Sequence, residues 1–130
     1  MSRVRRVLIV DDDADSADLL EHAVRSEGHE TRVAHDPGAA LVVVAEFKPQ
    51  VAFLDIDLPG MDGFELARAL RARSECSECR FVAVTGYDLP PQHQKDPPIF
   101  NAHLVKPVNL RKLQRLVLEL DHFEIMGVGS

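Results

Sequence analysis

Residues 51–63, VAFLDIDLPGMDG, run from an apolar segment through two acids into a turn rich in proline and glycine. A continuous apolar run that is bounded by turn residues predicts a short β-strand buried on both faces. Asp55 ends this run and Asp57 follows it closely. Because an unpaired carboxylate at the end of a buried strand costs free energy, these acids indicate a functional site.

Further strand-like segments occur along the chain, and helical patterns separate them. The predicted strands are residues 4–10, 29–35, 51–55, 80–86 and 103–105. Strands that alternate with helices predict the α/β class, with a doubly wound, five-stranded parallel sheet and right-handed crossovers.

Each predicted helix begins at a residue that can cap it. The capping residues are Asp13 or Asp15, Asp36 followed by Pro37, Asp62 and Asn109. Their short polar side chains accept hydrogen bonds from the free N–H groups of a first helical turn. Gly28 and Pro49 supply the stops of the first two helices. For His35, just before Asp36, we expect no role beyond the turn.

The segment before the fifth strand departs from this alternation. It reads GYDLPPQHQKDPPIFNAH, with four prolines between residues 90 and 98. Proline removes a backbone donor, clashes with the preceding turn and keeps the residue before it out of the helical region. We therefore expect an irregular Pro-rich segment in place of a regular fourth helix.

Length and charge restrict the classes of function. A chain of 130 residues fits one domain, which we place at residues 1–121, with a C-terminal tail at 122–130. The net charge is -6 and the 15 basic residues are scattered, which argues against a nucleic-acid surface. No apolar run is long enough to span a bilayer or to serve as a signal peptide. We expect a cytoplasmic protein that binds neither nucleic acid nor membrane.

Cys76 and Cys79 form a C-x-x-C pair within the stretch SECSEC. The pair follows a predicted helix and precedes a predicted strand, whereas a thioredoxin-type pair lies at the start of a helix. The sequence holds no second cysteine pair to complete a zinc site. We expect two thiols in a surface loop.

Polar residues stand at the carboxyl ends of four predicted strands. They are Asp11, Asp12, Asp55, Thr85 and Lys106. Ligands of open parallel sheets bind beyond the carboxyl ends of the strands, so these side chains should converge. Clustered carboxylates raise one another's pKa unless a cation lies among them, and Mg²⁺ prefers carboxylate and phosphoryl oxygens. Asp55 is then a candidate nucleophile for phosphoryl transfer.

The motifs VLIVDDD, FLDIDLPGMDGFEL, VAVTG and HLVKP, in this order and spacing, resemble the receiver domain of two-component response regulators. The resemblance covers residues 4–120. The stretch TGY followed by HLVKPVNL resembles the corresponding sequence of receivers that are attached to hybrid sensor histidine kinases. The resemblance implies the strand order 2-1-3-4-5, which is that of flavodoxin-like sheets.

The resemblance also implies roles for the acids. Asp55 is similar to the phosphoacceptor of the family, and Asp12 to a direct Mg²⁺ ligand. Asp11 would bind the ion largely through water, and Asp57 would contribute its backbone carbonyl. The implied cofactor is Mg²⁺.

The remaining motif residues acquire roles in the same way. Thr85 resembles the hydroxyl that turns toward the phosphoryl group, and Lys106 the ammonium group that pairs with it. A cis peptide before Pro107 would aim the lysine, a geometry that proline permits at low cost. Thr85 and His103 are the switch candidates, because His103 stands where the family has an aromatic switch residue. Two interpretations of His103 stay open: a side chain that swings as the aromatic one does, or a partly exposed strand residue with no part in signalling.

The function implied is that of a phosphoacceptor receiver in a phosphorelay. A histidine kinase or a histidine phosphotransfer protein would supply the phosphoryl group. The output would be contact with a downstream protein or with the remainder of a hybrid kinase. We expect no enzyme activity beyond Mg²⁺-dependent self-phosphorylation and slow autodephosphorylation.

Two other classes of function fit less well. DIDLP matches the D-x-D motif of haloacid-dehalogenase-type phosphatases, but that motif follows the first strand, its metal acids lie downstream, and Pro59 is out of place. A flavin-binding module needs a phosphate loop after the first strand, where this chain has DDDADS. Acids at that point would repel a phosphate group.

Overall fold

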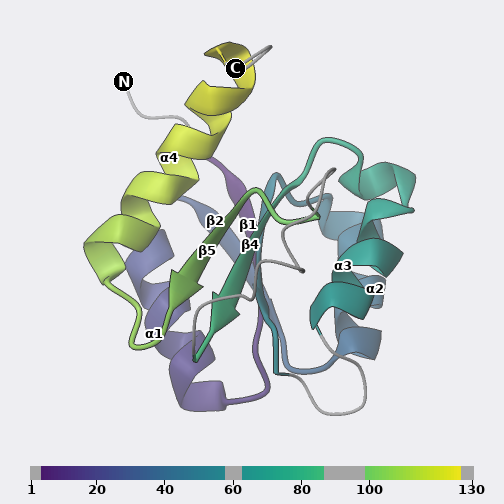
Figure 1. Cartoon of the computed structure of the whole chain (residues 1–130), viewed down its shortest axis with the longest axis horizontal. Coiled ribbons are helices and arrows are strands. Elements are labelled where there is room, and N and C mark those ends of the chain that lie inside the picture. Colours follow the sequence, from purple (N-terminus) through teal and green to yellow (C-terminus); the bar gives the residue numbers. More distant parts are fainter. Residues whose placement is uncertain (1–3, 58–62, 87–98, 127–130) are drawn as a thin grey trace.

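The computed structural model describes residues 4–57, 63–86 and 99–126 of the chain, with side chains in the last helix described to residue 119. A central parallel sheet lies between two layers of helices (Figure 1). The strands are β1 (Arg6–Val10), β2 (Glu30–Ala34), β3 (Val51–Asp55), β4 (Arg80–Thr85) and β5 (Ala102–Val105). The helices are α1 (Ala14–Arg25), α2 (Pro37–Phe47), α3 (Gly63–Arg71), the 3₁₀ helix η1 (Ser74–Cys76) and α4 (Leu110–Met126).

The strand order is β2-β1-β3-β4-β5, and every neighbouring pair is parallel. This confirms the predicted α/β class and the order 2-1-3-4-5. Since β1 and β3 are neighbours, their carboxyl ends lie side by side, and β4 ends next to β3. The carboxyl edge of the sheet therefore collects residues from distant parts of the sequence.

Alternate residues of each strand face opposite helical layers. In β1, Val7 and Ile9 pack in the core beneath α1 and α4, while Leu8 and Val10 pack in the core beneath α2 and α3. Figure 1 shows the same two helix pairs on opposite sides of the sheet. All five residues of β3 are buried, as expected for a strand covered on both faces.

The helix caps follow the sequence closely. Asp13 caps α1, with its carboxylate accepting hydrogen bonds from the N–H groups of Asp15 and Ser16. Asp36 caps α2, and the Asn109 Oδ1 accepts a hydrogen bond of 3.0 Å from Lys112 N–H at the start of α4. The predicted cap of α3, Asp62, lies outside the described residues.

Some boundaries differ from the prediction. Strand β1 begins at Arg6, because Val4 is exposed and pairs with no strand. Helix α4 continues to Met126, so residue 121, where we placed the end of the domain, falls inside a helix. Most of the Pro-rich segment, residues 87–98, lies outside the described residues, and residues 99–101 that follow it form no helix.

The prediction of two surface thiols was wrong. Cys76 and Cys79 are both reduced and almost completely buried, and they belong to the core beneath α2 and α3. Arg71 explains the burial, because its Nη1 donates to the carbonyl oxygens of Cys76 at 3.2 Å and Cys79 at 2.8 Å. The same guanidinium lies 4.1 Å above the ring centre of Phe81. These contacts draw the polar SECSEC turn against the sheet.

Among the described helices, none has both the length and the apolar character that crossing a membrane requires.

Candidate functional site

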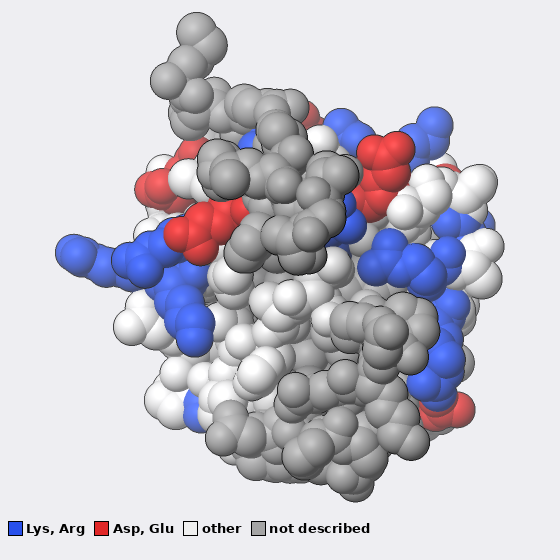
Figure 2. Space-filling model, turned by 45° about the horizontal axis from the view of Figure 1, so that its top comes forward, with Lys and Arg blue, Asp and Glu red and all other residues white. Residues whose placement is uncertain are grey.

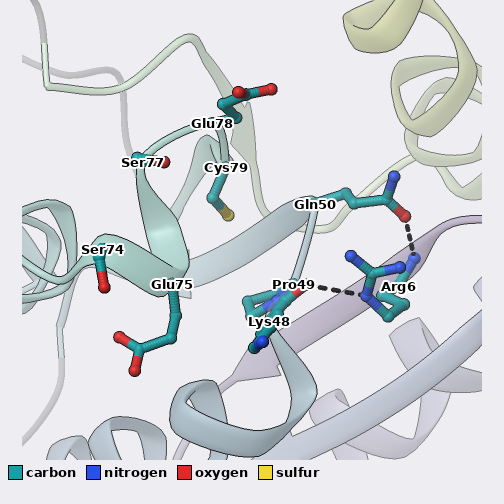
Figure 3. A pocket seen from close by; sticks show the side chains of 9 residues that line it. All are labelled: Arg6, Lys48, Pro49, Gln50, Ser74, Glu75, Ser77, Glu78 and Cys79. Carbon is teal, nitrogen blue, oxygen red and sulfur yellow. Dashed lines mark hydrogen bonds between the residues drawn. The ribbon is translucent and has the colours of Figure 1, made fainter.

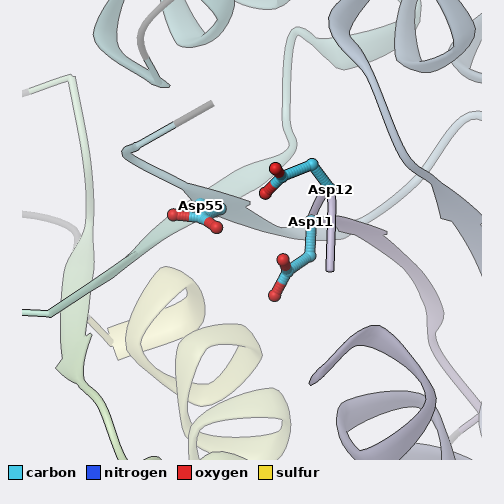
Figure 4. A group of neighbouring side chains, drawn as sticks. All are labelled: Asp11, Asp12 and Asp55. Carbon is cyan, nitrogen blue, oxygen red and sulfur yellow. The ribbon is translucent and has the colours of Figure 1, made fainter. Parts of the chain in front are cut away.

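Three carboxylates meet at the carboxyl edge of the sheet. Asp11 and Asp12 follow β1 and Asp55 is the last residue of β3, and one oxygen from each lies within 4.8 Å of the others. Figure 4 shows the three side chains gathered beyond the two strands. Asp11 is 1% exposed and Asp55 is 3% exposed, whereas Asp12 is open to solvent. The structure thus brings together the acids that the strand ends predicted.

The Asp11 carboxylate is only partly satisfied by the protein. Its Oδ1 accepts a hydrogen bond of 2.9 Å from Asp13 N–H. Its Oδ2 is buried and, within the described part of the chain, has no hydrogen-bond partner, while Lys106 Nζ lies 3.9 Å away. A buried anionic oxygen of this kind is costly unless a cation binds to it. The cluster therefore fits a hard divalent ion, since three oxygen donors of this type suit Mg²⁺.

Asp55 is held from two sides. Its Oδ1 accepts a hydrogen bond of 2.9 Å from Asp57 N–H, and its Oδ2 lies 3.3 Å from Lys106 Nζ. Burial raises the pKa of Asp55, the Asp57 N–H and the Lys106 charge lower it, and the neighbouring Asp11 raises it again. The net result is a pKa above the ordinary value. The cost of the charge on Asp55 is therefore only partly offset by the protein.

Lys106 is the cation of the site. It follows β5 directly, and its N–H donates a hydrogen bond of 2.7 Å to the Thr85 carbonyl oxygen. The peptide bond between Lys106 and Pro107 is cis. Burial lowers the pKa of Lys106, but the Asp55 and Asp11 carboxylates raise it, and its net pKa lies above the ordinary value. Lys106 is therefore an ammonium group at neutral pH.

The other predicted residues differ in their position in the sheet and in their exposure. Thr85 ends β4 and is fully buried, beside the strand that carries Asp55. Asp57 is exposed and contacts Asp55 through its backbone N–H. His103 lies within β5, opposite Ala83 of β4 and half-buried.

Two residues near the site had no assigned role in the sequence analysis. Gly63 opens α3 and donates its N–H to the Ile56 carbonyl oxygen at 2.9 Å, one residue beyond Asp55. His35 places its Nδ1 3.0 Å from the Asp11 carbonyl oxygen. Glycine in the stretch GMDGFEL is a signal for close backbone approach. A histidine after an edge strand carries no comparable signal.

A separate hollow of about 440 Å³ lies at the opposite edge of the sheet, near the amino ends of β1, β3 and β4. Its lining residues, drawn in Figure 3, are Arg6, Lys48, Pro49, Gln50, Ser74, Glu75, Ser77, Glu78 and Cys79. Arg6 already donates from Nε to the Phe47 and Lys48 carbonyl oxygens. Burial raises the pKa of the Cys79 thiol, so it is a poor nucleophile. The hollow shares no residue with the acid cluster.

Comparison with known families gives one match across most of the chain. Residues 7–118 match the family model described as the response regulator receiver domain. The aligned region contains every motif at the carboxyl edge of the sheet.

Solved structures agree with that match. A response regulator receiver domain protein of Methanospirillum hungatei JF-1 is 31% identical, with a TM-score of 0.80 over 95% of this chain and 99% of that one. A sensor protein from Polaromonas sp. JS666 is 28% identical, with a TM-score of 0.78 over 88% of this chain and 94% of that one.

Curated relatives match over a shorter region. The DNA-binding response regulator MtrA of Mycolicibacterium paratuberculosis and that of Mycobacterium leprae are each 46% identical over 70 residues. The match covers 54% of this chain and 31% of each relative. These relatives are therefore much longer than the region they share with this chain.

Proposed function

Because the chain belongs to the response regulator receiver domain family, we propose that Asp55 accepts a phosphoryl group from a phosphohistidine. The observation that carries this assignment is the environment of Asp55. It is a buried carboxylate with Lys106 Nζ at 3.3 Å, beside an Asp11 oxygen that has no hydrogen-bond partner. This arrangement leaves negative charge that a metal ion can neutralise, and the ion together with Lys106 can then pair with the oxygens of an incoming phosphoryl group.

The residues that would hold Mg²⁺ are Asp11, Asp12, Asp55 and the backbone carbonyl of Asp57. Bound Mg²⁺ supplies charge neutralisation for the phosphoryl oxygens. The Oδ2 of Asp11, which accepts no hydrogen bond from the described residues, supports this ligand set.

In the transfer step, an Asp55 carboxylate oxygen forms a bond to phosphorus while the bond from phosphorus to the histidine nitrogen breaks. The histidine nitrogen keeps the electron pair of that bond. Lys106 then pairs with a phosphoryl oxygen instead of the free carboxylate, and the Thr85 hydroxyl donates a hydrogen bond to another. Such transfer needs positioning and charge stabilisation more than covalent chemistry from the protein.

The partners follow from this chemistry. The donor is a histidine kinase or a histidine phosphotransfer protein, and the output is contact with a downstream protein or with the remainder of a hybrid kinase. The match to a sensor protein is consistent with a hybrid kinase. The MtrA relatives are DNA-binding proteins, but the shared region covers only 31% of their length.

For this chain we propose no direct contact with nucleic acid and a cytoplasmic location. In Figure 2, basic side chains lie on both flanks of the visible face, with acidic side chains among and between them. Charges of both signs are thus mixed over the described part of that face, and a binding surface for DNA would need a continuous basic area.

Receiver domains are signalling domains, and we propose that this one catalyses only its own phosphorylation and a slow loss of the phosphoryl group. The family match gives no support to a haloacid-dehalogenase-type phosphatase. The switch would run through Thr85 and His103, which lie on neighbouring strands.

Incubation with Mg²⁺ and acetyl phosphate, followed by intact mass measurement, tests the assignment. We expect a gain of one phosphoryl group that requires Mg²⁺ and is absent from Asp55→Asn. The matched control is Asp18→Asn, which removes an exposed acid of α1 outside the cluster and should be phosphorylated normally.

Two results would contradict the proposal. A phosphoryl adduct on Asp55→Asn would place the acceptor elsewhere. Steady release of phosphate without any adduct would instead indicate a phosphatase.

A further inference from the structure

His35 lies between two fixed elements. Strand β2 ends at Ala34, and α2 begins at Pro37 with Asp36 as its cap. The Ala34 carbonyl oxygen accepts a hydrogen bond of 3.1 Å from Asp11 N–H, and Asp36 Oδ1 accepts one of 2.8 Å from Ala39 N–H. The main chain on both sides of His35 is therefore held, and its ring is presented to the end of β1.

The ring contacts the backbone of an acid from the site. His35 Nδ1 lies 3.0 Å from the Asp11 carbonyl oxygen. Because a carbonyl oxygen only accepts hydrogen bonds, this contact requires a proton on Nδ1. Both backbone polar groups of Asp11 are thus bonded to consecutive residues, its N–H to Ala34 and its carbonyl to His35.

The Asp11 carbonyl belongs to the peptide unit that leads into Asp12. The Asp12 side chain is exposed, and among the described residues its carboxylate has no hydrogen-bond or ion-pair partner. Its direction therefore depends on the main chain at residues 11 and 12. A group that fixes this peptide plane therefore limits the positions, relative to Asp11 and Asp55, that the Asp12 oxygens can reach through the rotamers of the side chain.

We propose that His35 is a positioning residue for the acid cluster, acting through its hydrogen bond to the Asp11 carbonyl to hold Asp12 in place for a divalent cation. This inference rests on the proposed function. It assigns His35 no contact with the ion or with the phosphoryl group. Hydrogen-bonding partners that orient metal ligands affect metal affinity without binding the metal themselves.

The proposal is tested by titrating the protein with Mg²⁺ alone. The dissociation constant is obtained from the changes in the backbone amide chemical shifts of residues 11–13 and 55–57 in NMR spectra. We expect His35→Leu to bind Mg²⁺ about 3- to 10-fold more weakly than the wild type, the range for one lost hydrogen bond. His35→Asn, whose amide nitrogen can replace Nδ1 as donor, should recover most of the affinity. His22→Leu is the matched control, because His22 is an exposed histidine of α1 and should leave the affinity unchanged.

A spectroscopic measurement reports the hydrogen bond directly. At about pH 8, where an ordinary imidazole is neutral, the ¹⁵N shifts of His35 should show the proton on Nδ1. Thermal unfolding of each variant without metal separates a loss of fold from a loss of positioning. Variants that unfold at the wild-type temperature and still differ in Mg²⁺ affinity support the proposal.

The outcomes separate this inference from the proposed function. Wild-type protein that fails to bind Mg²⁺ overturns the proposed function together with the inference. If the wild type binds Mg²⁺ and His35→Leu binds it with equal affinity, the inference alone is overturned. The inference is also overturned if His35→Leu binds Mg²⁺ weakly and His35→Asn does not recover the affinity, or if the His35 proton is on Nε2. In either case the effect would not pass through the hydrogen bond.

Discussion

Gly63 shows how closely one residue constrains the site. A Cβ atom added there would lie 2.7 Å from Ile56 Cα and 2.8 Å from the Asp55 carbonyl oxygen. Both atoms belong to the backbone, so neither can move away without shifting the chain that carries Asp55. Any side chain at residue 63 therefore strains the segment that follows β3.

Replacement of Gly63 by alanine should destabilise the fold by about 1–3 kcal/mol, the usual cost of overpacking. It should also slow phosphorylation by acetyl phosphate, because the Asp55 peptide unit is displaced. Urea denaturation followed by circular dichroism measures the first effect. Gly38→Ala is the control, since its added Cβ meets only the Asp36 side chain, at 3.3 Å, and α2 should accept alanine. Equal stability of the two variants would contradict the argument.

His29 is a titratable residue away from the site. It is 6% exposed, and its Nδ1 accepts a hydrogen bond of 3.0 Å from Arg5 N–H. Burial lowers the pKa of His29, the Arg5 charge lowers it further, and Glu27 raises it in part. Because its folded pKa lies below the unfolded one, the unfolded chain binds the proton more readily. Stability should therefore fall as the pH drops through about 6.5, and this loss should level off below the folded pKa.

The variant His29→Asn keeps an acceptor near the position of Nδ1 and removes the titration. The free energy of unfolding, measured in urea at about pH 7.5 and about pH 5.5, should fall more for the wild type than for the variant. Because both proteins contain the same other titrating groups, the contributions of those groups to the pH dependence cancel in the comparison. An equal loss in both would show that His29 does not couple folding to pH.

Among the elements, the strands were the most predictable part of the sequence. Strand β3 was predicted at its observed bounds, because a strand covered on both faces is apolar throughout and ends at the first acid. Helix ends were less predictable. Helix α4 extends five residues past residue 121, where we placed the end of the domain, and the sequence has no glycine or proline between residues 110 and 126 that would stop it. Helix α1 ends at Arg25, and Gly28 follows with a positive φ of 90°.

The burial of the cysteine turn could not be predicted locally. The stretch SECSEC is polar, and its two cysteines are buried because Arg71 of the preceding helix holds their carbonyl groups against the next strand. Arg71 bonds both cysteine carbonyl oxygens and stacks on Phe81, which lies in β4. Contacts of this kind appear only once the helix, the turn and the strand are in place.

This arrangement predicts the reactivity of the two thiols. Burial raises the pKa of both Cys76 and Cys79. Since the thiolate is the reactive form, maleimide should label neither cysteine in the native protein near neutral pH and both in denaturant. Mass spectrometry gives the number of labelled cysteines.

Arg71→Leu should raise the labelling rate and lower stability by about 1–3 kcal/mol, because buried carbonyl groups lose their donor. Arg68→Leu, at an exposed position of the same helix, is the matched control and should behave as the wild type. Rapid labelling of the native wild type would contradict the assigned burial.

At the level of the whole molecule, the parallel sheet determines what could be foreseen of the site. The sequence predicted that Asp11, Asp55, Thr85 and Lys106 lie at one edge of the sheet, because each stands at the end of a strand and parallel strands end together. The contact of His35 was not predicted, because it depends on the ring reaching the carbonyl oxygen of Asp11, just beyond the end of the neighbouring strand. The convergence of residues at the strand ends thus follows from topology, whereas a side-chain contact such as that of His35 follows from packing.

The acid cluster also affects the stability of the whole domain. Three carboxylates share one edge with the Lys106 ammonium group, and burial, as the largest cause, raises the pKa of Asp55. A folded pKa above the unfolded value means that the ionised form opposes folding at neutral pH. Without metal, stability should therefore fall as the pH rises above about 3.8, the ordinary value, until it passes the folded pKa of Asp55.

Asp55→Asn should then be more stable than the wild type in the absence of divalent ions and should have a higher thermal midpoint. Addition of Mg²⁺ should stabilise the wild type by mass action and the variant much less, because one ligand has lost its charge. Differential scanning calorimetry with EDTA and with Mg²⁺ measures both effects. If Mg²⁺ raised the midpoints of both proteins equally, the ion would be binding away from Asp55, and the electrostatic cost of the cluster would need another explanation.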